Sequence, residues 1–269
     1  IKMKNKKIIG LVIGNLVSLL AVIVINALSS WLPLNGLDPG QISDSIPNLF
    51  VPSGLTFSIW GLIYIGFLLF GVFNIITLIK KKPEDIEVIE RVGIWFIISS
   101  VANITWIFLW HWLLILPSVF AMLTLLASLI VMYLKLGIGK RPVSWKEQIL
   151  VHVMISLYFG WITVATIANI VAVLVSVGLV PVLTSFGISE AFWTIIVISA
   201  ATVISIVNIF TRKDIAYNLV IIWAFTGILL KRLNSVPMEK GIVIFTGIAI
   251  GVIALSMIIK WSYYYYKKK

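Results

Sequence analysis

The chain has 269 residues, of which 61% are hydrophobic and only 12% charged, and its mean hydropathy is +1.11. A soluble globular domain carries roughly 25% charged residues, so this composition predicts an integral membrane protein. The lipid bilayer is then a predicted partner. The sequence contains no cysteine, which excludes a disulfide framework, a thiolate nucleophile and a thiolate metal site.

Apolar runs long enough to cross a bilayer as helices, about 20 residues each, recur along the whole chain. They predict an all-α, polytopic membrane helix bundle with eight transmembrane helices. We expect a five-helix module over 1–175, an outer linker over 176–190, and a three-helix extension with a basic cytoplasmic tail over 191–269. The eight predicted helices cover residues 8–32, 52–79, 92–110, 113–134, 147–175, 191–210, 215–230 and 241–260.

The connections between these runs carry local signals. Segment 33–51 contains three prolines and two glycines, which favour turns, so it is predicted to be neither helix nor strand. Both a lid over a binding site and a plain exposed connector fit it. Pro83 is followed by acidic residues, a pattern typical of a helix N-terminus. The turn 211–214 is so short that its flanking helices should be antiparallel neighbours.

Basic residues are distributed unevenly across the predicted membrane. With the N-terminus inside, 18 of the 21 Lys and Arg residues fall on the inner side, and only Lys231, Arg232 and Lys240 fall outside. Positive charge marks the cytoplasmic side, so we expect a multi-pass protein of the cell membrane with both termini in the cytoplasm. The net charge of +11 is then explained by orientation, and no nucleic-acid partner is predicted.

Three of the apolar segments carry aromatic and amide side chains at helical spacing. Lipid-facing helices need no Asn, so these stripes predict a shared, aromatic-lined pocket suited to a flat and mostly apolar ligand. For any single stripe, helix packing without a ligand is the alternative interpretation. The predicted ligand-binding residues are Trp60 and Tyr64 in the second segment, Asn103, Trp106 and Trp110 in the third, and Tyr158, Trp161, Ala165 and Asn169 in the fifth.

The same residues resemble the TspO / translocator-protein family, the tryptophan-rich sensory proteins. In that family the second helix opens with Pro-Pro, followed by Trp eight residues after the second Pro and Tyr four residues later. Pro52, Trp60 and Tyr64 keep this spacing, although Val51 replaces the first Pro. The third-helix and fifth-helix motifs match at Asn103, Trp106, Tyr158, Trp161, Ala165 and Asn169, with Leu157 in place of a Pro.

The resemblance covers roughly residues 8–175 and implies a function. Members of this family are five-helix proteins that bind porphyrins, haem and sterols in a pocket under the first loop, and they are implicated in trafficking and stress sensing. The resemblance therefore implies a porphyrin-like, haem-like or sterol-like ligand, with segment 33–51 as a lid. The last three predicted helices have no counterpart in five-helix members, which leaves a homodimer or a membrane complex open.

Other classes of function have weaker support. The chain has no Ser-His-Asp arrangement, paired carboxylates, P-loop or dinucleotide fingerprint, so no catalytic residue is predicted and a binding protein is favoured over an enzyme. His111 and His152 fall near opposite membrane faces, so no metal site is predicted. Two alternatives stay open. One is a secondary transporter of a small solute, although the interior of the predicted spans contains no acidic residue of the kind that proton-coupled transporters use. The other is a structural subunit of a larger membrane assembly.

Overall fold

The structure is a computed structural model that describes residues 2–32 and 34–266. The described residues form helices and connections without a strand. Seven helices are long and apolar enough to cross a membrane, and a bent pair raises the number to eight. The predicted all-α, polytopic bundle is therefore confirmed. The predicted basic tail at 267–269 lies outside the described residues.

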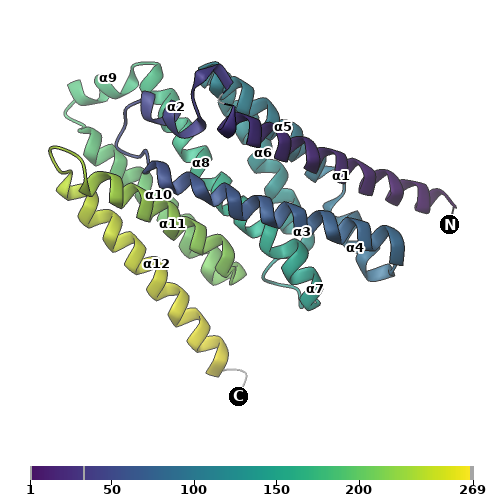
Figure 1. Ribbon diagram of the computed structural model, residues 1–269. Coiled ribbons are helices and arrows are strands. Elements are labelled where there is room, and N and C mark those ends of the chain that lie inside the picture. The colour runs from purple at the N-terminus through teal and green to yellow at the C-terminus, as the bar shows by residue number, and fades with distance from the viewer. Residues whose placement is uncertain (1, 33, 267–269) are drawn as a thin grey trace.

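Each long helix overlaps one predicted run, although some of their ends differ by up to seven residues, as at the start of α3 (Figure 1). Short helical segments fill several of the connections between them. The long helices are α1 (Lys2–Trp31), α3 (Ile59–Lys80), α5 (Trp95–His111), α6 (Ile115–Leu136), α8 (Val153–Ser176), α10 (Glu190–Arg212), α11 (Ile215–Leu233) and α12 (Lys240–Tyr266). The short segments are Leu34–Gly36, α2 (Pro39–Ser45), Gly54–Ser58, α4 (Pro83–Val92), α7 (Trp145–Glu147), the π-helical turn Gln148–His152 and α9 (Leu179–Ser185).

The prediction that segment 33–51 contains no helix is wrong, because α2 lies within it. The Asp38 carboxylate accepts hydrogen bonds from the Gly40 and Gln41 amides at 2.7 and 3.0 Å, and the Gln41 side chain accepts one from the Asp38 amide at 2.9 Å. This reciprocal capping box satisfies amides that are otherwise unpaired at a helix start. Pro39 in the first turn adds a preset helical φ.

The predicted helix start at Pro83 is confirmed, since α4 begins at this residue. A bend of 42° separates α4 from α5, and the two together form one broken candidate span. Gly93 ends α4 with a φ of 56°, which L-residues with side chains rarely adopt. The Lys146 side chain pairs with the Asp85 carboxylate at 2.6 Å and so connects α7 to α4.

The short turn between α10 and α11 brings these helices together as predicted. Asn218 on α11 donates a hydrogen bond to Asn208 on α10 at 2.9 Å, and Ser205 on α10 donates one to Asn218 at 2.6 Å. α11 also packs closely on α8, where a Cβ added to Gly160 would lie 2.9 Å from the Tyr217 carbonyl oxygen. The C-terminal helices are therefore packed directly onto the first five.

Buried amides within the spans pair across helices. Asn15 on α1 donates to Asn74 on α3 at 3.1 Å, and Asn26 on α1 donates to Asn103 on α5 at 2.7 Å. An unpaired amide in a membrane interior costs a few kcal/mol, so these bonds fix the rotation of α1 against its neighbours.

The bundle has two distinct ends (Figure 1). One end holds α2 and α9, and we call it the lid end. The other holds α4, α7 and the turn between α10 and α11, and we call it the basic end, because most of the lysines and arginines lie there.

Candidate ligand-binding pocket

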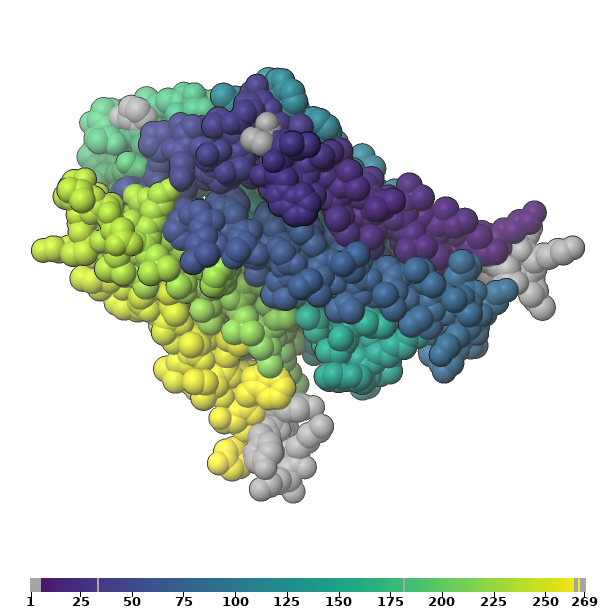
Figure 2. Space-filling model, in the orientation of Figure 1, coloured from purple at the N-terminus to yellow at the C-terminus, as the bar shows by residue number. Residues whose placement is uncertain are grey.

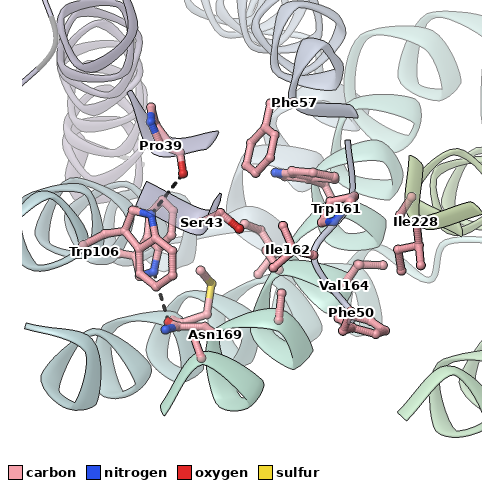
Figure 3. Close-up of a pocket in the computed structure, with 18 of the residues that line it drawn as sticks. Pro39, Ser43, Phe50, Phe57, Trp106, Trp161, Ile162, Val164, Asn169 and Ile228 are labelled. Atoms are coloured by element: carbon pink, nitrogen blue, oxygen red, sulfur yellow. Dashed lines mark hydrogen bonds between the residues drawn. The ribbon is translucent and has the colours of Figure 1, made fainter. Parts of the chain in front are cut away.

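A pocket lies at the lid end, under α2 and between α3, α5, α8 and α11 (Figure 3). Its enclosed cavity measures about 50 Å³. The lining is mostly aromatic and small apolar, with few polar groups. It consists of Pro39, Ser43, Asn48, Phe50, Val51, Pro52, Phe57, Trp60, Trp106, Trp110, Met122, Trp161, Ile162, Val164, Ala165, Ala168, Asn169, Ala172, Ala224 and Ile228.

Most of the residues predicted from the sequence meet at this pocket. The structure places Trp60, Trp106, Trp110, Trp161, Ala165 and Asn169 in its lining. It leaves Tyr64, Asn103 and Tyr158 outside the lining. That the six lining residues contact a ligand stays a prediction. The other three lie behind the lining.

The three residues outside the lining support its walls. Tyr64 stacks on Trp60 with ring centroids 5.7 Å apart. Tyr158 is buried and meets the edge of Phe67 at 5.1 Å, and its centroid is also 6.1 Å from Trp60. Asn103 is engaged by Asn26 of α1, as described above. These side chains hold the lining rings in place without reaching the cavity.

Trp106 and Trp110 form a stacked pair on α5, with centroids 5.5 Å apart and planes 20° from parallel. Trp106 donates its indole N–H to Asn169 at 3.1 Å, and Trp110 donates its own to the Pro39 carbonyl at 3.3 Å (Figure 3). Both donors are therefore used within the protein. A ligand can therefore contact only the parts of these rings that are outside the stack, and it cannot use their N–H groups.

The opposite side of the pocket is built from Phe57, Trp60 and Trp161. Trp161 meets Phe57 at 5.8 Å and Trp60 at 6.3 Å, both nearly perpendicular. Neither Trp60 nor Trp161 donates its indole N–H to any other described residue. These two are the indole donors that a bound ligand can use.

Asn169 joins three helices at the pocket floor. Its side-chain oxygen accepts hydrogen bonds from Trp106 on α5 and from Ser118 on α6, at 3.1 and 3.2 Å. Its amide nitrogen lies 2.9 Å from the Ser118 hydroxyl. Because all its bonds hold helices together, Asn169 fixes the position of Trp106.

Small residues leave the space that the rings surround. Ala165, Ala168 and Ala172 follow steps of three and four along α8 and all line the pocket. Ala168 and Ala172 were not predicted, although their helical spacing from Ala165 is a signal in the sequence. Ala224 and Ile228 on α11 were also missed, because nothing distinguishes them from other apolar residues of a membrane helix.

The segment over the pocket is fastened to the C-terminal helices. The Leu49 amide donates to Glu190 at the start of α10 at 2.9 Å, and Lys231 on α11 pairs with Asp44. The Ser53 amide donates to the Gly227 carbonyl at 3.0 Å. Trp223 adds an indole hydrogen bond to the Thr56 carbonyl at 2.9 Å. α10 and α11 therefore hold both the lid and the start of the second membrane segment.

The part of the chain that the structure describes holds no group of three or more His, Asp or Glu side chains placed to bind a metal. His111 is buried with its Nδ1 2.7 Å from the Ile107 carbonyl oxygen, and it does not line the pocket. His152 lies 3.1 Å from Glu147 at the basic end.

An aromatic pocket enclosed by membrane-length helices defines the chain as a multi-pass α-helical membrane protein. A family model described as TSPO-like protein matches residues 11–259, which is most of the chain. The chain therefore belongs to the TSPO-like protein family. The match continues past residue 175 and includes α10 and α11 and most of α12. No curated protein and no solved structure matches the chain.

Proposed function

We propose that this protein binds a planar, largely apolar ligand of the tetrapyrrole class in the pocket at the lid end, for sensing or for transfer across or within the membrane. The observation that carries the proposal is the gathering of Trp60, Trp106, Trp110 and Trp161 around one cavity. Indole rings stack on flat ligands. Membership in the TSPO-like family adds support.

The size of the cavity sets a condition on this function. Pockets for drug-sized ligands enclose about 300–1,000 Å³, whereas this one encloses about 50 Å³. A tetrapyrrole therefore needs the lid to move, and the lid is held by the Glu190 and Lys231 contacts. One of these contacts joins side chains that both reach solvent, because Asp44 and Lys231 are 53% and 27% exposed.

The direct test is a titration of the purified protein with protoporphyrin, followed by the absorbance of the porphyrin and by tryptophan fluorescence. Ring contact in the pocket is expected to shift the Soret band and to quench the fluorescence with a saturable, micromolar dependence. A transporter of small solutes or a structural subunit predicts no saturable change. An absence of saturation at micromolar porphyrin would reject the proposal.

Filling the cavity should separate binding from folding. Ala165→Leu adds bulk where the lining has space, so we expect clearly weaker porphyrin binding with little loss of stability. In a tightly packed core the same added methylenes cost about 1–3 kcal/mol. The matched control is Ala200→Leu, on an exposed face of α10 away from the pocket. Failure of Ala165→Leu alone to fold would identify this position as packed core.

The orientation in the membrane is also a proposal. The strong excess of lysine and arginine at the basic end supports a cytoplasmic position for that end and for both termini, in the cell membrane. Since the chain has no native cysteine, single cysteines report the side directly. We expect a membrane-impermeant maleimide to label Lys240→Cys in intact cells and to leave Lys81→Cys unlabelled. The reverse pattern would invert the topology.

A further inference from the structure

A second and much larger cavity, of about 1,000 Å³, opens at the basic end. It lies between the loop that follows α6, the start of α8, the α10–α11 turn and α12. Figure 1 shows α12 diverging from α7 and α8 toward its C-terminal end, and Figure 2 shows the surface hollowed between them. The lining consists of Ile138, Gly139, Lys140, Arg141, Pro142, Trp145, Gln148, Ile149, Val153, Ser156, Lys213, Asp214, Ile215, Ala216, Leu219, Lys260 and Trp261.

Basic residues outnumber acidic ones in the lining of this cavity. Lys140, Arg141, Lys213 and Lys260 come from three separate parts of the chain, and Asp214 is the acidic residue among the lining residues. The Asp214 side chain is buried and accepts a hydrogen bond from the Tyr217 amide at 3.2 Å as the cap of α11. Burial raises the pKa of the Asp214 carboxyl. Asp214 is thus buried under the turn, whereas Lys140 and Lys213 are exposed.

The basic loop is built into a fixed position. A Cβ on Gly139 would overlap the carbonyl of Arg212, so the loop backbone rests directly on the end of α10. The Arg141 guanidinium pairs with Glu147 of α7, and its Nε lies 3.4 Å from the Leu136 carbonyl oxygen. The loop backbone and the Arg141 side chain are thus held in place at the rim.

The apolar lining runs from this rim along the start of α8 and of α11. Ile149 in the π-helical turn and Val153 in α8 are four residues apart, and so are Ile215 and Leu219 in α11. Leu219 is 52% exposed. At the rim Trp145 and Trp261 are also exposed, which is typical of indole rings at the headgroup level. The cavity therefore combines a cationic mouth with an apolar interior.

We propose that this cavity is a binding site for an anionic phospholipid, with its phosphate at Lys140, Lys213 and Lys260 and an acyl chain along Val153 and Leu219. Basic pockets between membrane helices on the cytoplasmic side bind acidic lipid headgroups. A soluble phosphate would use the cations alone, whereas a lipid also uses the apolar wall. The site is separate from the pocket at the lid end and does not depend on the function proposed for it.

The test is native mass spectrometry of the detergent-purified, full-length protein with three probes: dioctanoylphosphatidylglycerol, dioctanoylphosphatidylcholine and inorganic phosphate. We expect the anionic lipid to bind at least roughly tenfold more tightly than the zwitterionic one, from the attraction of several lysines. Equal binding of the two lipids would overturn the proposal. Binding of inorganic phosphate as tight as that of the anionic lipid would also overturn it, in favour of a soluble anion.

A matched pair of variants assigns the binding to this cavity. The triple variant Lys140→Gln, Lys213→Gln, Lys260→Gln should lose at least roughly tenfold in affinity for the anionic lipid. The control Lys80→Gln, Lys81→Gln, Lys82→Gln removes the same charge from another connection at the basic end and should change it less than about threefold. Should the site triple fail to fold, Lys140→Glu, at an exposed position, replaces it. Equal losses in site and control variants would contradict the assignment.

Discussion

Gly139→Ala is expected to destabilise the protein by about 2–4 kcal/mol, combining the strain of a left-handed backbone with overpacking. Gly139 has a φ of 74°, and a Cβ there would overlap the backbone carbonyl of Arg212. Because the obstacle is backbone, the α6–α8 loop and the end of α10 must separate. The free energy of unfolding in mixed detergent micelles, followed by tryptophan fluorescence, measures the loss.

Gly178→Ala is the matched control for this experiment. Gly178 also has a φ of 74°, but a Cβ there would meet nothing within 4 Å. It should therefore show only the backbone cost, about 1–2 kcal/mol. Similar losses in the two variants would mean that the contact between the loop and α10 contributes nothing measurable to stability.

Trp161→Leu is expected to weaken porphyrin binding by about 0.5–1.5 kcal/mol, the scale of one aromatic pair. The substitution keeps the helix apolar but removes a ring that faces Phe57 and Trp60, together with one of the indole donors left for a ligand. Trp60→Leu and Trp106→Leu should have losses of the same size. The Soret absorbance is the suitable measurement, because removing a tryptophan changes the fluorescence by itself.

The control for the indole variants is Trp112→Leu. Trp112 is 51% exposed and does not line the pocket, so its loss should leave porphyrin affinity unchanged. Equal affinities in wild type and in all three pocket variants would show that any porphyrin binds elsewhere, such as on the outer apolar surface of the bundle.

The sequence predicts the membrane-spanning helices well, because each of them needs about 20 apolar residues to cross the bilayer, regardless of the helices that pack against it. It predicts the pocket only in part. Helical spacing places Tyr158 and Trp161 on one broad face, yet Tyr158 packs against Phe67 while Trp161 reaches the cavity. A face of that width includes both the packing seam and the pocket wall, so periodicity cannot separate them.

Two other features show different reasons for a missed prediction. α2 has a capping signal in the sequence, Asp38 with Gln41 three residues later, but the prolines and glycines around it favoured a turn. Ala224 and Ile228 have no such signal, since any membrane helix contains residues of this kind. Their place in the pocket depends on the close packing of α11 against α8 at Gly160, which only tertiary structure reveals.

The attachment of the lid to α10 and α11 links two parts of the chain that are far apart in sequence, namely the segment over the pocket and the C-terminal helices. A ligand that enters only when the Leu49 and Asp44 contacts break binds at the expense of contacts made by α10 and α11. Coupling of this kind is reciprocal: whatever shifts α10 or α11 changes ligand affinity by the same factor by which the ligand changes their docking. The docking of α10 and α11 on the bundle is therefore also what keeps the segment over the pocket in place.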